Sequence, residues 1–276
     1  MRARRSGFVA LALGAWLGLS GCVPGFGTGH GQGNTDWRTG SCHRLTDAID
    51  LSLDVVSETS PSVTCSEEHS TETFGTRSVP ARIARYRERP SPFLMAGAIR
   101  PLCGKDDLAA FMGAGDGEQL YGVQPFAFGP SRLEWNRGVR SVRCDAVLAT
   151  DPGQPLAEPT LSTSLKGILT TGYGARFRLC RVTDHAGRHT RTGCDQPHSA
   201  ESAGTAAPAP DGRTAQERCD RLAARYVGGP LPDRLVVRAE PAAAELGCWI
   251  GPAEPDTLRT GSLHASGHRT KTGRTT

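Results

Sequence analysis

The sequence predicts an α+β protein made of two tandem small disulfide-braced units, each a short, mainly antiparallel sheet with one helix. After residue 40 the chain holds eight cysteines, which fall into two sets of four. The segments around these two sets recur in the same order. Each set also encloses one segment with the apolar spacing of a helix, among shorter segments typical of strands.

The N-terminal segment has the features of a secretory signal. Three arginines within the first five residues precede an uncharged apolar run over residues 8–21. That run of about 14 residues is too short for a membrane span, which needs about 20. It ends in Leu-Ser-Gly-Cys at residues 19–22, which is similar to a bacterial lipobox. We therefore expect residues 1–21 to be a lipoprotein signal peptide and Cys22 to be diacylated, the alternative being an ordinary signal with an incidental cysteine.

Two further segments lack the composition of a folded element. Residues 22–39 are rich in glycine and predict a flexible tether. A phosphate-binding glycine loop is the alternative, but it lacks a preceding strand and a following helix. Residues 266–276 contain Thr, Gly and basic residues and predict a disordered basic tail.

The repeat sets the domain boundaries. CHRLTD from residue 42 matches CRVTDH from 180, and VTCSEEHSTE from 63 matches TGCDQPHSAE from 192. DLAAFMG from 107 matches RLAARYVGG from 221, CDAVLATDPG from 144 matches CWIGPAEPDT from 248, and STSLKG from 162 matches RTGSLHA from 259. Five matches in one order are improbable by chance. They predict tandem units at residues 40–169 and 173–265.

The eight cysteines predict disulfides in an oxidising compartment. They are Cys42, Cys65, Cys103 and Cys144 in the first set, and Cys180, Cys194, Cys219 and Cys248 in the second. Four cysteines allow three pairings per unit, of which the sequential one closes the shortest loops. Each such loop contributes about 3 kcal/mol in the chain-entropy model. Structural zinc sites favour close C-x-x-C pairs, which this chain lacks, so we expect no metal and no cofactor.

A histidine and a glutamate follow the second cysteine of each set with the same spacing. They are His69 and Glu72 in the first unit, and His198 and Glu201 in the second. Such pairs could ligate a metal, or Glu72 could orient His69 as a general base. Neither the metal site nor the catalytic pair has a third residue at a spacing that the sequence makes recognisable. We expect the histidines to hold structure by hydrogen bonding.

Local patterns predict several elements. ERCDRLAARYVGG, residues 217–229, places apolar residues on one helical face and ends in two glycines, and KDDLAAFMG, residues 105–113, is its shorter equivalent. RGVRSVRC, residues 137–144, alternates like a strand with Cys144 on the inner face. DVVSETSPSVTC, residues 54–65, suits a hairpin around a Ser-Pro turn. We expect Trp135 to pack in the core, the alternative being a sugar-binding platform.

Together these residues resemble the actinobacterial septum formation-related domain. The resemblance covers residues 40–169 and rests on Gly40, Cys42, Cys65, His69, Glu72, Cys103, Trp135, Gly138, Arg140 and Cys144. The second unit keeps its four cysteines, His198 and Glu201, but it is shorter and lacks the Trp-Gly-Arg stretch. The sequence therefore does not predict the same sheet there. The resemblance implies a secreted, lipid-anchored or membrane-tethered envelope protein, linked to septation by name and without a known activity.

Charge and motifs narrow the function. Three of the 32 basic residues lie within residues 1–21, which hold no acidic residue, so the chain from Cys22 onward carries a net charge of +1. That near-neutral balance does not indicate a nucleic-acid partner. The chain has no G-x-S-x-G, H-E-x-x-H or S-x-x-K motif, although triads form in space and not along the sequence. We expect a non-enzymatic binding or scaffold module at the outer face of the cell membrane, with an envelope or division protein as partner. The alternative is a cell-wall-active hydrolase with His69 in its site.

Overall fold

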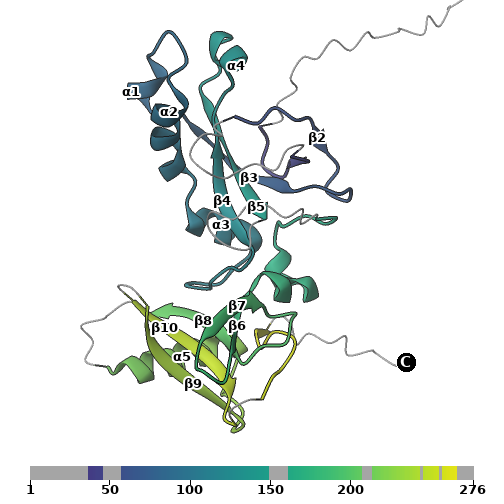
Figure 1. Ribbon diagram of the computed structural model, residues 1–276, viewed down its shortest axis with the longest axis vertical. Helices are drawn as coiled ribbons and strands as arrows, with labels where there is room; N and C mark the ends of the chain where they lie inside the picture. Colours follow the sequence, from purple (N-terminus) through teal and green to yellow (C-terminus); the bar gives the residue numbers. More distant parts are fainter. Residues whose placement is uncertain are drawn as a thin grey trace, which may run out of the picture. The chain divides into compact units, whose positions relative to one another are not determined.

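The described part of the chain forms two five-stranded sheets in which every pairing is antiparallel (Figure 1). The computed structural model describes residues 37–45, 57–148, 161–206, 213–242, 245–254 and 257–265. The predictions for the signal peptide, Cys22, residues 22–36 of the tether, and the tail lie outside these residues. No helix in the described ranges is long and apolar enough to cross a membrane.

The first sheet is built from strands β1 to β5, and we call it and its helices the first unit. The strands are β1 (Cys42–His43), β2 (Ser62–Val63), β3 (Thr71–Ser78), β4 (Val123–Phe128) and β5 (Ser141–Leu148). Their order across the sheet is β2-β1-β3-β5-β4. The longest pairing joins β3 to β5, with an irregularity in register between Thr73 and Gly75.

The second sheet, in what we call the second unit, has the corresponding order β7-β6-β8-β10-β9. Its strands are β6 (Leu179–Thr183), β7 (His189–Gly193), β8 (Ala200–Ala206), β9 (Leu235–Ala242) and β10 (Glu245–Pro252). Although the sequence did not predict it, the shortened second unit keeps all five strands. The second unit is shorter in the segments that connect its strands. The strands themselves are kept, because they pair through backbone hydrogen bonds.

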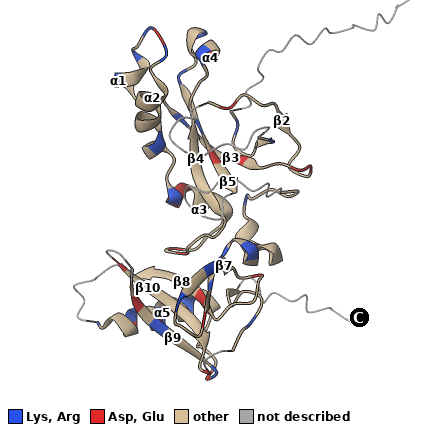
Figure 2. Ribbon diagram, in the orientation of Figure 1, with Lys and Arg blue, Asp and Glu red and all other residues tan. Residues whose placement is uncertain are grey.

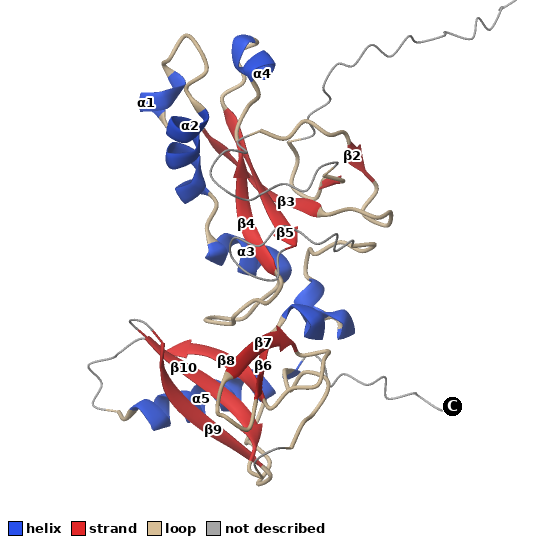
Figure 3. Cartoon of the chain, in the orientation of Figure 1, coloured by secondary structure: helices blue, strands red, loops and turns tan. Residues whose placement is uncertain are grey.

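The predicted helices are α3 (Lys105–Met112) and α5 (Ala215–Val227). Each ends at a glycine with a left-handed backbone, Gly113 and Gly228, as the sequence predicted. Helix α5 begins with a capping box between Thr214 and Glu217 and buries Cys219, Leu222, Ala223 and Tyr226, the face expected from their spacing. This helix packs on β8, β9 and β10 (Figure 3).

The first unit has three more α-helices than the pattern predicted. They are α1 (Ala81–Ala84), α2 (Pro92–Ile99) and α4 (Arg132–Asn136). Two short 3-10 helices of this unit are η1 (Arg100–Leu102), directly after α2, and η2 (Ile168–Thr170); a third, η3 (Gly172–Phe177), precedes β6 and opens the second unit. Helix α2 is apolar all round, so it has no amphipathic pattern to reveal it.

Four disulfides join the cysteines sequentially: Cys42–Cys65, Cys103–Cys144, Cys180–Cys194 and Cys219–Cys248. In each unit one bond lies beside the first strand and its neighbouring turn, and the other ties the helix region to the last strand. The predicted α+β fold class, with two tandem disulfide-braced units, is confirmed.

Two local predictions differ from the structure. Residues 137–144 do not form one strand: α4 ends at Asn136, a turn follows at Gly138, and β5 begins at Ser141. Cys144 is buried as expected, but so is almost every later residue of β5, because both faces of this strand are covered. The strand β2, within the predicted hairpin, pairs with β1 and not across the Ser-Pro turn, while residues 54–56 lie outside the described ranges.

Candidate functional site

The two predicted histidines occupy equivalent positions just before a central strand. His69 precedes β3 and His198 precedes β8, and neither side chain is exposed. Each forms a two-way backbone bridge with a distant segment, His69 with Leu161 and His198 with Arg259. In each ring Nδ1 lies 2.8 Å from the carbonyl oxygen two residues earlier, that of Glu67 or of Gln196. Because a carbonyl only accepts, Nδ1 carries the proton and donates it.

The two predicted glutamates receive hydrogen bonds from those same distant segments. The Glu72 carboxylate accepts from the Ser164 hydroxyl at 2.7 Å and from the Leu165 backbone N–H at 2.5 Å. The Glu201 carboxylate accepts from the Ser262 hydroxyl and, at 2.7 Å, from the Leu263 backbone N–H. We call His69, Glu72 and residues 161–165 the first closing site, and His198, Glu201 and residues 259–263 the second.

The second closing site has one more donor. The Tyr226 hydroxyl on α5 donates to Glu201 at 2.6 Å. Burial and the adjacent Glu201 carboxylate raise the pKa of Tyr226 well above its ordinary value, so the phenol remains a donor across the physiological range. This bond ties the helix of the second unit to its closing site.

Burial shifts the titration of the closing sites. It raises the pKa of Glu72, although the hydrogen bonds from Ser164 and Leu165 oppose that shift. It lowers the pKa of His198, which favours the neutral imidazole. The Nε2 atoms of His69 and His198 are buried and have no hydrogen-bond partner among the described residues. In His198 the neutral ring leaves Nε2 as an unprotonated acceptor, which avoids burying a charge.

Each closing site brings together side chains of metal-ligating types. Possible ligand atoms of Cys42, His69 and Glu72 lie within 4.8 Å of one another, as do those of Cys180, Cys194, His198 and Glu201. The sulfurs, however, belong to the disulfides Cys42–Cys65 and Cys180–Cys194, and a disulfide offers no thiolate. Both carboxylates already accept at least two hydrogen bonds. The oxidised donor set therefore leaves one imidazole nitrogen per unit, which does not fit a zinc site.

The geometry also differs from that of a catalytic dyad. The His69 Nδ1 proton is directed to the Glu67 backbone and not to the Glu72 carboxylate. Glu72 in turn is bound to residues 164 and 165. A general base needs to reach a substrate proton, and neither His69 nor His198 has any exposed surface.

The third group of predicted residues, Trp135 and Arg140, forms a stacked pair in the first unit. The Arg140 guanidinium carbon lies 3.6 Å from the Trp135 ring centroid. Arg140 also donates to the carbonyls of Trp135, Val139 and Ala84 at 2.8 to 3.0 Å. Trp135 is buried, so it offers no flat face to a sugar. The pair fastens the turn after α4 to the end of α1.

The first sheet carries a buried cluster of charged residues. The sequence did not predict this cluster. Arg143 contacts Glu58 at 2.7 Å and Asp145 at 3.1 Å, and donates to His43 Nε2 at 3.3 Å. Burial, and then the charge of Arg143, lower the pKa of His43. The Arg-x-Asp alternation along β5 was the available signal, but an alternating charged strand ordinarily predicts a solvent-exposed face. In the second unit Arg181 instead pairs with Glu240, at 2.5 and 2.6 Å.

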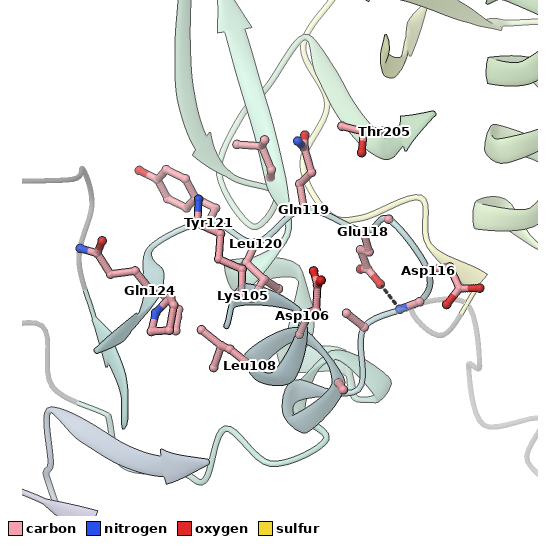
Figure 4. A pocket seen from close by; sticks show the side chains of 18 of the residues that line it. Lys105, Asp106, Leu108, Asp116, Glu118, Gln119, Leu120, Tyr121, Gln124 and Thr205 are labelled. Carbon is pink, nitrogen blue, oxygen red and sulfur yellow. Dashed lines mark hydrogen bonds between the residues drawn. The ribbon is translucent and has the colours of Figure 1, made fainter. Parts of the chain in front are cut away.

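A pocket of about 690 Å³ lies beside α3 and the glycine-rich loop that follows it (Figure 4). Two of its polar side chains have structural partners: Glu118 accepts from the Gly115 N–H at 2.9 Å and pairs with Arg178 at 2.6 Å, and Gln119 accepts from the Ser202 hydroxyl at 2.9 Å. None of the site residues predicted from sequence lines this pocket. It brings together no histidine or cysteine that could react.

A comparison with protein families decides the classification. Residues 39–244 match the family described as septum formation. The chain belongs to the septum formation family. The resemblance inferred from residues 40–169 is therefore confirmed, and the single match runs on through β9 of the second unit. No curated protein and no solved structure shows a significant match to the chain.

Proposed function

We propose that this septum formation family protein is lipid-anchored at the outer face of the cell membrane, where it acts as a non-enzymatic binding or scaffold module in septum formation. Three observations support the proposal. The family is named for septum formation. Four disulfides suit an extracytoplasmic, oxidising space. The sequence at residues 19–22 is similar to a lipobox.

The structure of the closing sites is the observation that carries the non-enzymatic part. The same histidine, glutamate and Ser-Leu segment occur twice, and both times the histidine Nδ1 and the carboxylate bind the protein's own groups. Because these groups hold both sheets together inside the protein, we expect partners to bind at its outer surface. The hydrolase alternative needs a reachable His69, which the burial of that side chain opposes.

Membrane anchoring is tested by comparing the parent chain with Cys22→Ser. We expect the parent protein in the membrane fraction, with mass spectrometry showing an acylated N-terminal Cys22. The Cys22→Ser chain should leave the membrane fraction, because diacylation supplies the stable anchor. A soluble, unmodified mature parent would refute the anchoring.

The binding role is tested with the double variant His69→Gln, His198→Gln and with the parent. At a temperature where both are folded, we expect neither to release soluble fragments from purified cell wall. Both should be found at division septa as fluorescent fusions and should crosslink in the membrane to the same proteins. Wall fragments released by the parent and lost in His69→Gln would establish the hydrolase instead.

A further inference from the structure

The first unit exposes large apolar side chains at one end. They are Tyr86 after α1, Phe93 and Leu94 at the start of α2, and Leu133 in α4, with exposed fractions of 48%, 74%, 41% and 56%. Only two other large apolar side chains in the described ranges are comparably exposed, Tyr173 and Leu258. The exposed apolar surface is therefore concentrated on and beside three helices that have no counterpart in the described part of the second unit.

These residues belong to one connected surface, which we call the arginine-apolar end. Arg89, between α1 and α2, donates to the Pro130 carbonyl before α4 at 2.7 Å. Arg140, after α4, donates to the Ala84 carbonyl at the end of α1 at 3.0 Å. The three helices lie at the same end of the first unit (Figure 3). The two arginine bonds hold the segments that carry Tyr86 and Leu133 together.

The arginine-apolar end is strongly basic. Its exposed arginines are Arg82, Arg85, Arg87, Arg132 and Arg137. Figure 2 shows basic positions on the ribbon around α1 and α4. None of the five has an ion-pair partner among the described residues. Of its acids, Glu88 is exposed, whereas Glu134 is buried in the cap of α4. This contrasts with the net charge of +1 for the whole chain from Cys22 onward.

We propose that the arginine-apolar end docks on an anionic lipid bilayer, with its arginines on the headgroup phosphates and Phe93, Leu94, Leu133 and Tyr86 at the acyl boundary. Basic residues near a bilayer are attracted to anionic lipids, and guanidinium groups bind phosphate oxygens with two hydrogen bonds. A surface that was only basic would bind any polyanion. The apolar side chains between the arginines favour a bilayer, whose interface accepts both kinds of group.

This docking rests on the proposed location beside a membrane, but its chemistry is independent of the lipid anchor. The anchor would place the unit near the bilayer, and the arginine-apolar end would then orient it. Orientation matters for a binding module, because it decides which surfaces face the septum and which face the membrane.

The test is vesicle cosedimentation of the chain from residue 22 onward carrying Cys22→Ser, so that no acyl chain contributes. We expect at least about tenfold more binding to vesicles containing phosphatidylglycerol than to vesicles of phosphatidylcholine alone, and weaker binding as salt rises. Arg85→Glu with Arg87→Glu should reduce binding to the phosphatidylcholine level. Phe93→Ser should weaken it several-fold and remove the part that persists at high salt.

The second unit offers matched controls. Tyr173 is 77% exposed, close to the 74% of Phe93, and Arg191 is an exposed arginine on β7. Tyr173→Ser and Arg191→Glu should leave vesicle binding unchanged. Equal melting temperatures for all variants would show that they are folded.

Three results would overturn the docking: equal binding to both vesicle types, unchanged binding in the Arg85 and Arg87 double variant, or binding to soluble polyphosphate but not to vesicles. The last would assign the surface to a phosphate polymer. Because Cys22 is absent from this assay, failure here leaves the anchoring proposal standing. Failure of the anchoring experiment likewise leaves the vesicle result intact.

Discussion

The first and second units share a strand order, two disulfides and one closing site each, but they differ in what surrounds these shared parts. The first unit adds α1, α2, α4, the Trp135–Arg140 stack and a buried cluster around Arg143. In the described part of the second unit the one α-helix is α5, which Tyr226 holds to the closing site. What recurs is the set of bonds that closes each sheet. What differs is partly buried, in the Trp135 stack and the Arg143 cluster, and partly exposed, in the apolar side chains on and beside α1, α2 and α4. The exposed part is where partner-specific contacts are to be sought.

Removing a helix-region disulfide should have the largest effect and should affect both units alike. Cys103 and Cys144 are 41 residues apart, and Cys219 and Cys248 are 29 apart. Chain entropy predicts a loss of about 3 to 4 kcal/mol for Cys103→Ala with Cys144→Ala, and for Cys219→Ala with Cys248→Ala. The two losses should agree within about 0.5 kcal/mol, because loop entropy changes slowly with length.

Urea unfolding of the two double variants measures this, with Cys22→Ser as a control that removes a cysteine outside the disulfides. A loss in one unit several times larger than in the other would show that the disulfides do not brace the units equally.

The glutamates should separate the two closing sites. Glu201→Ala leaves the Tyr226 and Ser262 hydroxyls and the Leu263 N–H without their acceptor, whereas Glu72→Ala affects only Ser164 and Leu165. We expect losses of about 3 kcal/mol for Glu201→Ala and about 2 kcal/mol for Glu72→Ala.

Tyr226→Phe isolates the extra bond, since it removes one donor and keeps the ring. In the Tyr226→Phe background the cost of Glu201→Ala should fall to that of Glu72→Ala. If it does not, Tyr226 is not the source of the difference between the sites.

The histidines should give smaller losses, and the loss at His198 should depend on pH. His69→Gln and His198→Gln should each cost about 1 to 2 kcal/mol at neutral pH, because the bond from Nδ1 is lost, and neither should lower metal binding relative to the parent. Burial lowers the pKa of His198 in the folded state. The unfolded chain therefore binds the proton more readily, and this contribution to stability is lost as pH falls below about 6.5.

Thermal unfolding between pH 8 and pH 5 should thus show a flatter loss of stability for His198→Gln than for the parent. His185→Gln, at an exposed position, serves as the control. A variant that melts like the parent yet loses a bound metal or a partner would place the histidine in a functional site.

Arg140 should give the smallest effect, confined to the first unit. Arg140→Lys keeps the charge but cannot hold three carbonyls and the face of Trp135 together. We expect a loss of about 1 kcal/mol, with hydrogen exchange increasing around α1 and α4 and unchanged in the second unit. Faster exchange in β6–β10 would contradict a local role.

The sequence predicted the two-unit fold because its main constraints are covalent or repeated. Cysteine spacing and five recurring segments define both units, and the disulfides have the pairing with the shortest loops. The sequence predicted the residues of the closing sites but not their contacts. His69, Glu72 and the Ser-Leu repeat could be recognised in the sequence. The bond between Glu72 and Ser164, however, joins residues 92 positions apart and depends on the folded sheet. Helix α2 was missed because it is apolar on its exposed side as well as on its buried side, which leaves no amphipathic pattern. The Arg143 cluster was missed because alternating charges along a strand ordinarily predict a solvent-exposed face.

The order of the closing bonds along the chain bears on how the protein emerges during synthesis or export. Both disulfides of the first unit, the His69 bridge and the Glu72 bonds require no residue beyond Leu165, whereas β6 begins only at Leu179. A chain that appears N-terminus first can therefore seal one sheet before the next has left the channel. The disulfides of the first unit can therefore form before the cysteines of the second unit emerge, which limits mispairing between the two units.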